Sequence, residues 1–388
     1  MPKYDYIIAG AGCAGLSLLY YIITEPELSQ KKILVIDQNL EKANDRTWCF
    51  WETSEGAFEQ IVTKQWDRIS IHNGEANYEL PTAPFTYKMI EGIHFYNYIL
   101  TAAKQFSNIE WFETAVLDMK VQDNVATVQW SGGSATADYV FTSIVMPTKQ
   151  NTAITSQSKA PFLWQHFKGM VVEFETPLFD DTIAKLMDFN VDQKGDTAFM
   201  YVLPLSHTKA LVEYTLFSPQ CIDESAYDQQ LQAYLTKQYP HSAYTVLHTE
   251  QGAIPMTTST FSNIEAPIYA IGTMGNAVKA STGYAFTNIQ DQVKNIVEAL
   301  VNKKKINTKI NTRRHQFYDA VLLYILFHHK MKGAEIFTRI FAKNNAATVF
   351  KFLSNRSNLI EDIQIMRTLP TRIFLPAALQ HMASSYNG

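Results

Sequence analysis

The chain has 388 residues, of which 46% are apolar, and a formal net charge of -4. It is long enough to bury a substantial core in two or three domains. No apolar run reaches the roughly 20 residues that span a bilayer, and no basic signal-peptide segment follows Met1, so neither a spanning helix nor a signal peptide is expected.

The three cysteines are Cys13, Cys49 and Cys221. Their number is odd and their spacing is not that of metal ligands. They predict free thiols in a reducing, cytoplasmic setting.

The first 37 residues have the pattern of a dinucleotide-binding unit. Tyr4–Ala9 is a short apolar run typical of a buried strand, Gly10–Gly15 is a GxGxxG turn, and Leu16–Ile23 is an apolar helix. Lys32–Ile36 predicts a second strand that ends in Asp37. A GxGxxG turn between a strand and a helix, with an acid about 20 residues on, is a specific signal for a dinucleotide.

Each part of this unit has a physical reason. Gly10 permits the tight turn, Gly12 lets the backbone approach a pyrophosphate, and Gly15 lets the helix and strand pack closely. The N–H groups and the positive dipole end of the helix face the phosphates. Asp37 would accept hydrogen bonds from an adenosine ribose. The unit alone leaves FAD and NAD open, and its position at the N-terminus of a long chain favours FAD.

An aromatic segment, Asn44–Trp51, follows the second strand. It is either a loop anchored by aromatic side chains, or a part of the site in which Arg46 contacts phosphate or flavin and the aromatics form a pocket wall. The sequence alone leaves both interpretations open.

The next residues predict further parts of the first domain. Trp66–Leu80 predicts strands and Glu91–Phe106 an amphipathic helix. Val116–Trp130 and Ala137–Val145 predict strands, with Gly132 and Gly133 in the turn between them. Lys149–Lys159 is polar and rich in Ser and Thr, and we expect a linker there.

A second domain is expected from about Pro161. Strands are predicted at 169–174, 198–205, 210–217 and 246–254, and a surface helix at 220–239. In the third of these strands Glu213 shares a face with apolar and aromatic residues. An unpaired carboxylate in such a place would be costly, so Glu213 is exposed, bonded, or held protonated for use. The residues sharing its face are Leu211, Thr215 and Phe217, and those on the other face are Val212, Tyr214 and Leu216.

A second strand, glycine loop and helix element lies late in the chain. Ile268–Gly272 predicts a short strand, and glycines 272, 275 and 283 punctuate the loop that follows. Ser281, Thr282 and Gly283 precede a helix that runs through Ala299. In FAD proteins of the glutathione-reductase type such an element brings a helix N-terminus toward the flavin, which favours FAD over NAD here.

The region from Val301 to Lys343 is basic and helical, with ten Lys or Arg residues against two acidic residues. Its helices have apolar faces, and this combination fits docking on an anionic membrane surface. The alternative is a helical cap with a solvated basic rim. No recognised nucleic-acid-binding module accompanies the basic residues, so nucleic acid is not expected.

Several motifs along the chain resemble the flavoprotein lycopene cyclases of bacteria and plants. Their order matches as well, and the resemblance covers nearly the whole chain. The motifs are Asn44–Trp51 (NDRTWCFW), Phe199–Leu205 (FMYVLPL), Leu211–Ser218 (LVEYTLFS), Gly252–Met256 (GAIPM) and Ile271–Tyr284 (IGTMGNAVKASTGY), followed by Phe352–Leu353 and Leu369–Pro370.

This resemblance implies an α/β fold with a Rossmann-type, glutathione-reductase-like FAD-binding domain, an inserted substrate-covering β-sheet domain and a helical C-terminal region. The implied domains are 1–160 with 251–300 for FAD, 161–250 for substrate with part of 50–90, and 301–388 for the helical region. The implied location is cytoplasmic, peripheral to the inner membrane.

The resemblance also implies an activity. The ψ-ends of lycopene would cyclise to β-rings through a one-ring intermediate, with no net redox change. The reaction would need reduced FAD, with NADPH or NADH as the electron source, and no metal. Lycopene and other acyclic carotenoids are the implied substrates.

By position, Glu213 matches the required acid of the family's FLEET-like motif. Two residues depart from the plant pattern: Tyr214 stands where plants have a second Glu, and Ala280 where they often have Pro. A single acid leaves open which group removes the final proton. Either Glu213 donates the proton, and could also retrieve it after ring closure, or the reduced flavin is the acid and Glu213 orients or stabilises.

These arguments predict three sets of site residues. The catalytic residue is Glu213. The cofactor residues are Gly10, Gly12, Cys13, Ala14, Gly15, Asp37, Arg46, Gly272, Gly275, Ser281, Thr282 and Gly283. The substrate pocket is lined by Trp48, Phe50, Tyr201 and Tyr214.

Two rival functions remain at this stage. A monooxygenase or polyene reductase on the same fold would consume oxygen or reductant with each turnover. A carotenoid-binding or membrane-scaffold flavoprotein would have no turnover and would not need Glu213.

Overall fold

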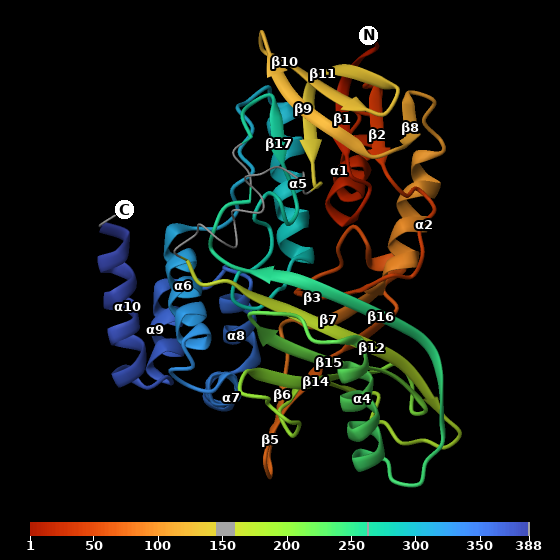
Figure 1. The fold of residues 1–388 in the computed structure, drawn as a ribbon. Helices are drawn as coiled ribbons and strands as arrows, with labels where there is room; N and C mark the ends of the chain where they lie inside the picture. The colour runs from red at the N-terminus through yellow and green to blue at the C-terminus, as the bar shows by residue number, and fades with distance from the viewer. Residues whose placement is uncertain (145–159, 262–263, 387–388) are drawn as a thin grey trace.

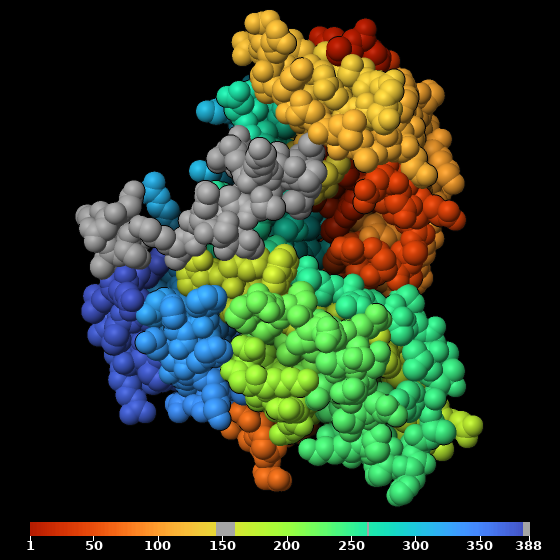
Figure 2. Space-filling view, in the orientation of Figure 1, coloured from red at the N-terminus to blue at the C-terminus, as the bar shows by residue number. Residues whose placement is uncertain are grey.

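The computed structural model describes residues 1–144, 160–261 and 264–386. The predicted linker at 149–159 lies outside them. Strands of the described residues form two seven-stranded sheets and one three-stranded sheet. The N-terminal sheet lies above the second large sheet in Figure 1, and the C-terminal helices stand beside the second sheet. Figure 2 shows the same division in space-filling form.

The first sheet carries the glycine turn. Its elements are β1 (Lys3–Ala9), α1 (Cys13–Thr24), β2 (Ile33–Asp37), α2 (Gly92–Ala103), β8 (Ile109–Glu113), β9 (Val116–Gln122), β10 (Val125–Trp130), β11 (Gly133–Thr142), β17 (Ile268–Ala270) and α5 (Phe286–Val301). The strand order is β8-β2-β1-β11-β10-β9, with β17 beside β11. Strands β8, β2, β1, β11 and β17 are parallel, and β9 and β10 form an antiparallel extension.

Both faces of the parallel strands are covered, which explains their continuous apolar sequences. Ile7 and Ile8 in β1 point to opposite faces and are both fully buried. Helices α1, α2 and α5 supply the core on one face, while β9 and β10 contribute Val116, Ala126 and Val128 to the other.

The chain reverses between β9 and β10 at Asp123 and Asn124, whose φ angles are +51° and +61°. Short polar residues tolerate this left-handed conformation, so the hairpin turn forms without glycine. The turn inside 116–130 was not predicted from the sequence, and only the structure shows it.

The second sheet has the order β16-β12-β15-β14-β13-β5-β6. Helix α4 packs on one face against Val212, Tyr214 and Leu216. Strand β13 was not predicted from the sequence. It pairs with β14 on one side and with β5 on the other, and so connects the strands from residues 68–81 to the rest of the sheet. The elements are β5 (Arg68–Asn73), β6 (Ala76–Pro81), β12 (Leu163–Phe174), β13 (Ile183–Asp188), β14 (Thr197–Pro204), β15 (Lys209–Ser218), α4 (Glu224–Gln238) and β16 (Tyr244–Met256).

The aromatic segment forms part of the small sheet rather than only a loop. Its strands are β3 (Thr47–Glu52), β4 (Lys64–Trp66) and β7 (Thr86–Glu91), and the short helix η1 (Glu59–Ile61) lies before β4. Strand β7 pairs with both β3 and β4. This pairing fixes the direction of alternate side chains in the aromatic segment.

Five helices follow: α6 (Arg313–Phe327), α7 (Gly333–Lys343), α8 (Ala346–Leu353), α9 (Leu359–Arg367) and α10 (Thr371–Tyr386). Polar side chains set three of their starts, because Thr312, Asn345 and Asn358 each accept a backbone N–H of the first turn. None of the helices in the described part of the chain is both long and apolar enough to cross a bilayer.

Apolar side chains of α6 and α7 are largely buried in the core that they share with the second sheet. The apolar faces of 301–343 are therefore not available for membrane docking, which was one of the two interpretations of this region, and their packing fits the other, a helical cap. Large exposed apolar side chains gather instead on α9 and α10, where they are Leu359, Ile360, Ile363, Met366, Leu375, Leu379 and Met382.

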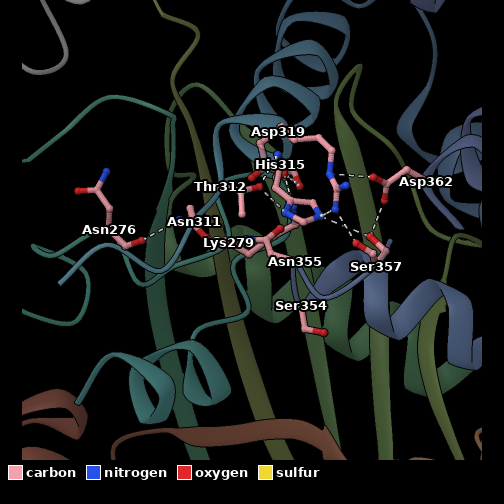
Figure 3. Close-up of polar contacts among 12 residues, drawn as sticks. Asn276, Lys279, Asn311, Thr312, His315, Asp319, Ser354, Asn355, Ser357 and Asp362 are labelled. Carbon is pink, nitrogen blue, oxygen red and sulfur yellow. Dashed lines mark hydrogen bonds and ion pairs between the residues drawn. The ribbon is translucent and has the colours of Figure 1, made fainter. Parts of the chain in front are cut away.

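A buried polar network joins the loop before α5 to these helices (Figure 3). The Lys279 ammonium and the Ser281 hydroxyl both donate to Oδ1 of Asp319 on α6. Nε of Arg314 lies 3.0 Å from Oδ2 of Asp362 on α9. Removing one partner of a buried ion pair is strongly destabilising, so these contacts hold the loop against the helical region.

Candidate active site

A cavity of about 430 Å³ connects the glycine turn with the second sheet. On one side it is bordered by the start of α1, and on the other by the inner faces of β14, β15 and β16. The predicted site residues in its wall are Gly12, Cys13, Ala14, Arg46, Trp48, Tyr201, Glu213, Gly272, Thr282 and Gly283.

The glycine turn has different reasons for its glycines. Gly10 has a φ of +102°, which favours glycine. A Cβ on Gly15 would lie 1.9 Å from the Gly10 carbonyl oxygen, and one on Gly272 would lie 2.7 Å from the Ala14 Cβ. Gly12 has an ordinary φ of -88°, and within the described part of the chain no atom other than those of its chain neighbours lies within 4 Å of its Cβ position. The protein's own packing therefore does not require glycine at 12, and the space in front of it belongs to the cavity.

Asp37 lies beside this turn at the end of β2. Its carboxylate accepts the N–H of Ala11 at 2.6 Å and the N–H of Asn39 at 2.8 Å. A carboxylate has about four acceptor sites, so capacity remains for the hydroxyls of a ribose. Asp37 is not in the wall of the cavity.

The sheet wall of the cavity contains two carboxylates. In the register of the sheet, Gly169 on β12 is paired with Glu213 on β15 and with Glu250 on β16. Tyr201 on β14 is paired with Glu213 on the other side. Residues directly opposite one another share a face, and Glu213, Glu250 and Tyr201 all line the cavity.

The two carboxylates have different hydrogen-bond partners. The Thr215 hydroxyl donates to Oε1 of Glu213 at 2.6 Å. The Thr47 hydroxyl, on β3, donates to Oε2 of Glu250 at 2.8 Å. Residue exposure is 8% for Glu213 and 6% for Glu250, so both are largely removed from water.

Burial changes the acidity of both groups. Desolvation, and then the nearby Glu250 carboxylate, raise the pKa of Glu213 to about 8, against a smaller lowering by the Thr215 hydrogen bond. Desolvation raises the pKa of Glu250 to about 7, while the Thr47 hydrogen bond and the Arg46 charge oppose the rise. Near neutral pH the pair therefore retains a proton that can be delivered inside a largely apolar cavity.

Glu250 is a residue that the sequence analysis missed. Its strand is at the edge of the sheet and most of its residues are partly or fully exposed, so the sequence has no alternation that marks a buried face. The available signal is a carboxylate in a predicted strand, two residues before the GAIPM motif. Only the sheet register shows that it faces Glu213.

The four predicted pocket aromatics separate into two groups. Trp48 and Tyr201 line the cavity. Phe50 does not, because it is buried and stacked on Phe286 with ring centroids 4.5 Å apart. Tyr214 also lies outside the cavity wall, contrary to the prediction. It is on the opposite face of β15 from Glu213, fully buried in the core beneath α4. Alternation along the strand makes this placement necessary.

Two of the predicted cofactor residues also lie elsewhere. Gly275 is absent from the cavity wall, and a Cβ there would lie 2.5 Å from the Ala270 carbonyl oxygen, so its role is close packing. Ser281 points to Asp319 at 2.7 Å instead. Thr282 and Gly283 do reach the cavity, and Arg46 lies in its wall with a 2.9 Å ion pair to Asp45.

Nowhere in residues 1–144, 160–261 or 264–386 do three or more His, Cys, Asp or Glu side chains form a cluster that could hold a metal ion. The cavity wall supplies carboxylates, hydroxyls, thiols, a guanidinium group and aromatic rings.

Comparison with known proteins identifies a family whose model matches most of the chain. The family model described as "Lycopene cyclase protein" matches residues 5–379 of the chain. A lycopene beta-cyclase of Pantoea ananas is similar to it, with 25% identity over 302 residues, which are 73% of this chain and 71% of the relative.

Solved structures are similar over most of the chain. A flavoprotein/dehydrogenase from Cytophaga hutchinsonii superposes with a TM-score of 0.64 at 11% identity, covering 98% of this chain and all of the other. A halogenase in complex with FAD gives 0.59 at 10% identity, covering 94% of this chain and 85% of the other. The predicted fold class, an α/β flavoprotein fold with a helical C-terminal region, is confirmed.

The raised pKa of Glu213 predicts a pH-dependent stability. In the unfolded chain a glutamate has a pKa near 4.3, so between about pH 5 and pH 8 the folded protein binds more protons than the unfolded chain. The free energy of unfolding should therefore fall with rising pH in this window, by about 1.4 kcal/mol per pH unit at most for one group. Chemical denaturation at a series of pH values measures it.

The variant Glu213→Gln, which cannot ionise, should flatten this slope. Glu173→Gln, on an exposed position of β12, is the matched control and should leave the slope unchanged. Equal slopes for wild type and Glu213→Gln would contradict the buried, protonated state.

Proposed function

Because the chain belongs to the lycopene cyclase family, we propose that it converts the acyclic ψ-ends of lycopene to β-rings, through γ-carotene to β-carotene. The observation that carries this proposal is Glu213, a buried acid in a cavity that also borders the glycine turn. The similarity to a lycopene beta-cyclase supports the ring type.

The proposed chemistry is a proton-driven cyclisation. Glu213 donates its proton to a terminal C=C of the polyene, and the resulting cation closes onto an internal C=C to form the ring. A proton is then lost from the ring, so atoms and electrons balance without net oxidation or reduction. The aromatic rings of Trp48 and Tyr201 in the cavity wall can stabilise the cation.

The proposed cofactor is FAD in its reduced form, with NADPH or NADH keeping it reduced. The residues fit it, because Gly12 has open space where a pyrophosphate would lie and Asp37 keeps acceptor capacity beside the turn. Arg46 and Gly272 border the same cavity. When bound, an anionic reduced flavin would stabilise a nearby cation by its charge.

A redox flavoenzyme acting on an apolar polyene is the alternative, since the same fold serves monooxygenases and reductases. The two functions differ in stoichiometry. A cyclase leaves the mass of the carotenoid unchanged and consumes no reductant per ring.

We also propose that the protein is cytoplasmic and docks on the inner membrane, where a carotenoid is dissolved. The exposed apolar side chains of α9 and α10 support this, together with Arg367 and Arg372, which are exposed in the same two helices. Apolar side chains and a few basic ones suit an anionic bilayer surface. A cavity of about 260 Å³, lined mainly by apolar side chains of α6, α9 and α10, opens in this region.

Turnover of lycopene tests the proposed cyclisation. Anaerobic protein with FAD, reduced by dithionite and mixed with lycopene in liposomes, should give γ- and β-carotene of unchanged mass, separated by chromatography. Glu213→Gln should lower the rate by about 10²- to 10⁴-fold, because it removes the proton donor. Tyr214→Phe, which changes the opposite face of the same strand, should keep full activity.

Products of altered mass, a requirement for oxygen, or loss of reductant with each turnover would move the assignment to a redox flavoenzyme. Full cyclisation by Glu213→Gln would remove Glu213 from the mechanism.

The affinity for FAD tests the proposed cofactor site at Gly12. Gly12→Val should fold normally, since the backbone is in an ordinary conformation and the described residues, the two chain neighbours aside, place no atom within 4 Å of the new Cβ. The side chain would occupy the space proposed for the pyrophosphate, so the affinity for FAD should fall about ten-fold or more. Quenching of flavin fluorescence on titration measures the affinity, and thermal melting of the apoprotein serves as the control for folding. Unchanged FAD affinity would place the pyrophosphate elsewhere.

Binding to liposomes tests the proposed docking surface on α9 and α10. Ile360→Glu/Leu379→Glu should weaken co-sedimentation with anionic liposomes by about ten-fold or more, because two apolar contacts are lost and negative charge is added. The control is Leu117→Glu/Leu247→Glu, which changes two exposed apolar residues on other elements. Equal losses for both pairs would argue against a docking surface on α9 and α10.

A further inference from the structure

The second carboxylate of the cavity, Glu250, has no part in the proton donation described above. It reaches Glu213 across three neighbouring strands, β16, β12 and β15. The residue between the two acids is Gly169, which is paired with both. Neighbouring strands lie about 4.8 Å apart, so the backbone positions of the two acids are on the order of 10 Å apart across the sheet.

Gly169 allows the two side chains to share this space. A Cβ on Gly169 would lie 3.3 Å from Cγ of Glu250 and 3.5 Å from Cβ of Glu213. Any larger residue would stand between the carboxylates. The strand position between the two acids therefore adds no side chain of its own, and the nearest atom to this position is Cδ1 of Leu211, at 3.1 Å.

The surroundings of the two acids differ in a way that favours different protonation states. Glu250 accepts a hydrogen bond from Thr47, and the cationic Arg46 precedes Thr47 in the chain and lines the same cavity. These contacts favour its carboxylate form, against the opposing charges of Asp45 and Glu91. Glu213 shares its face with the apolar side chains of Leu211 and Phe217, and this desolvation favours the neutral acid more strongly than the single hydrogen bond donated by Thr215 favours the carboxylate.

We propose that Glu250 is a second catalytic residue, the base that accepts the proton lost from the newly formed ring. This role rests on the proposed cyclase function. The Glu213 O–H bond breaks as a C–H bond forms at the terminal C=C. The internal C=C supplies the electron pair of the new C–C bond. A C–H bond on the neighbouring ring carbon then breaks, its electrons form the ring C=C, and the proton goes to Glu250.

The net result of one cyclisation is transfer of a proton from Glu213 to Glu250. The substrate gains one proton and loses one, and no electrons leave it. The two groups line one cavity, so a proton passing back from Glu250 to Glu213 restores the starting state. A pair of acids thus explains how a chain with Tyr214 in place of a second motif acid can complete the reaction.

The test uses the full chain with reduced FAD and lycopene in liposomes. Glu250→Gln should lower the cyclisation rate by about 10²- to 10⁴-fold, and Glu250→Asp should recover part of it, because a shorter carboxylate is still a base. Glu173→Gln, exposed on β12, should be fully active. FAD affinity and thermal melting should stay near wild type, which separates catalysis from a structural role.

The pH profile provides a second readout. Wild-type activity should fall at low pH as Glu250 becomes protonated and at high pH as Glu213 ionises. The groups that set these limbs are Glu213 and Glu250 themselves. Arg46, Asp45 and Glu91 lie around Glu250, and the Cys49 thiol and the phenols of Tyr201 and Tyr284 line the same cavity. The residual activity of Glu250→Gln should lose the low-pH limb.

Two results would overturn the proposal, and they are distinguishable. An active wild type with fully active Glu250→Gln, or with an unchanged low-pH limb, would refute the role of Glu250 alone. A wild type that forms no cyclic product with reduced FAD would refute the proposed function and this role together.

Discussion

Two largely buried carboxylates share one cavity, and this arrangement constrains the second sheet. Ionised carboxylates are costly to bury, so the pair is compatible with the fold only if a proton remains in the cavity or each charge has a partner. Thr215 and Thr47 each donate one hydrogen bond. The strand order β16-β12-β15 and glycine at 169 are what allow two acids to occupy one face.

The same cavity depends on the C-terminal helices for its closure. Phe337 and Phe341 of α7 and Leu353 of α8 contribute to its wall. The loop that carries Thr282 and Gly283 is attached to α6 through Lys279 and Asp319. The basic, helical end of the chain is thus part of the site, because its apolar faces pack inward and cover the cavity beside the sheet.

The fold alone does not distinguish a proton-transfer enzyme from a redox enzyme, since flavoproteins of several activities share it. The proposed activity rests instead on the wall opposite the glycine turn. Here that wall contains a buried acid, a second carboxylate and aromatic rings, which suit protonation of an alkene and stabilisation of a cation.

The sequence by itself determined the local elements and the residues whose role depends on near neighbours in the chain. The glycine turn followed from Gly10, Gly12 and Gly15, because a strand, a tight turn and a helix are specified by adjacent residues. The side-chain alternation of β15 placed Glu213 on one face with Leu211 and Thr215, and it contradicted a pocket position for Tyr214.

Only the tertiary structure decided which distant residues face each other. Glu250 is 37 positions after Glu213 along the chain, and nothing in the local pattern of an edge strand indicates its partner. Register between strands depends on hydrogen bonds across β12, so a shift of one residue would turn Glu250 away from the cavity. In the same way, packing on the sheet decided that the apolar faces of α6 and α7 are core, while those of α9 and α10 meet solvent.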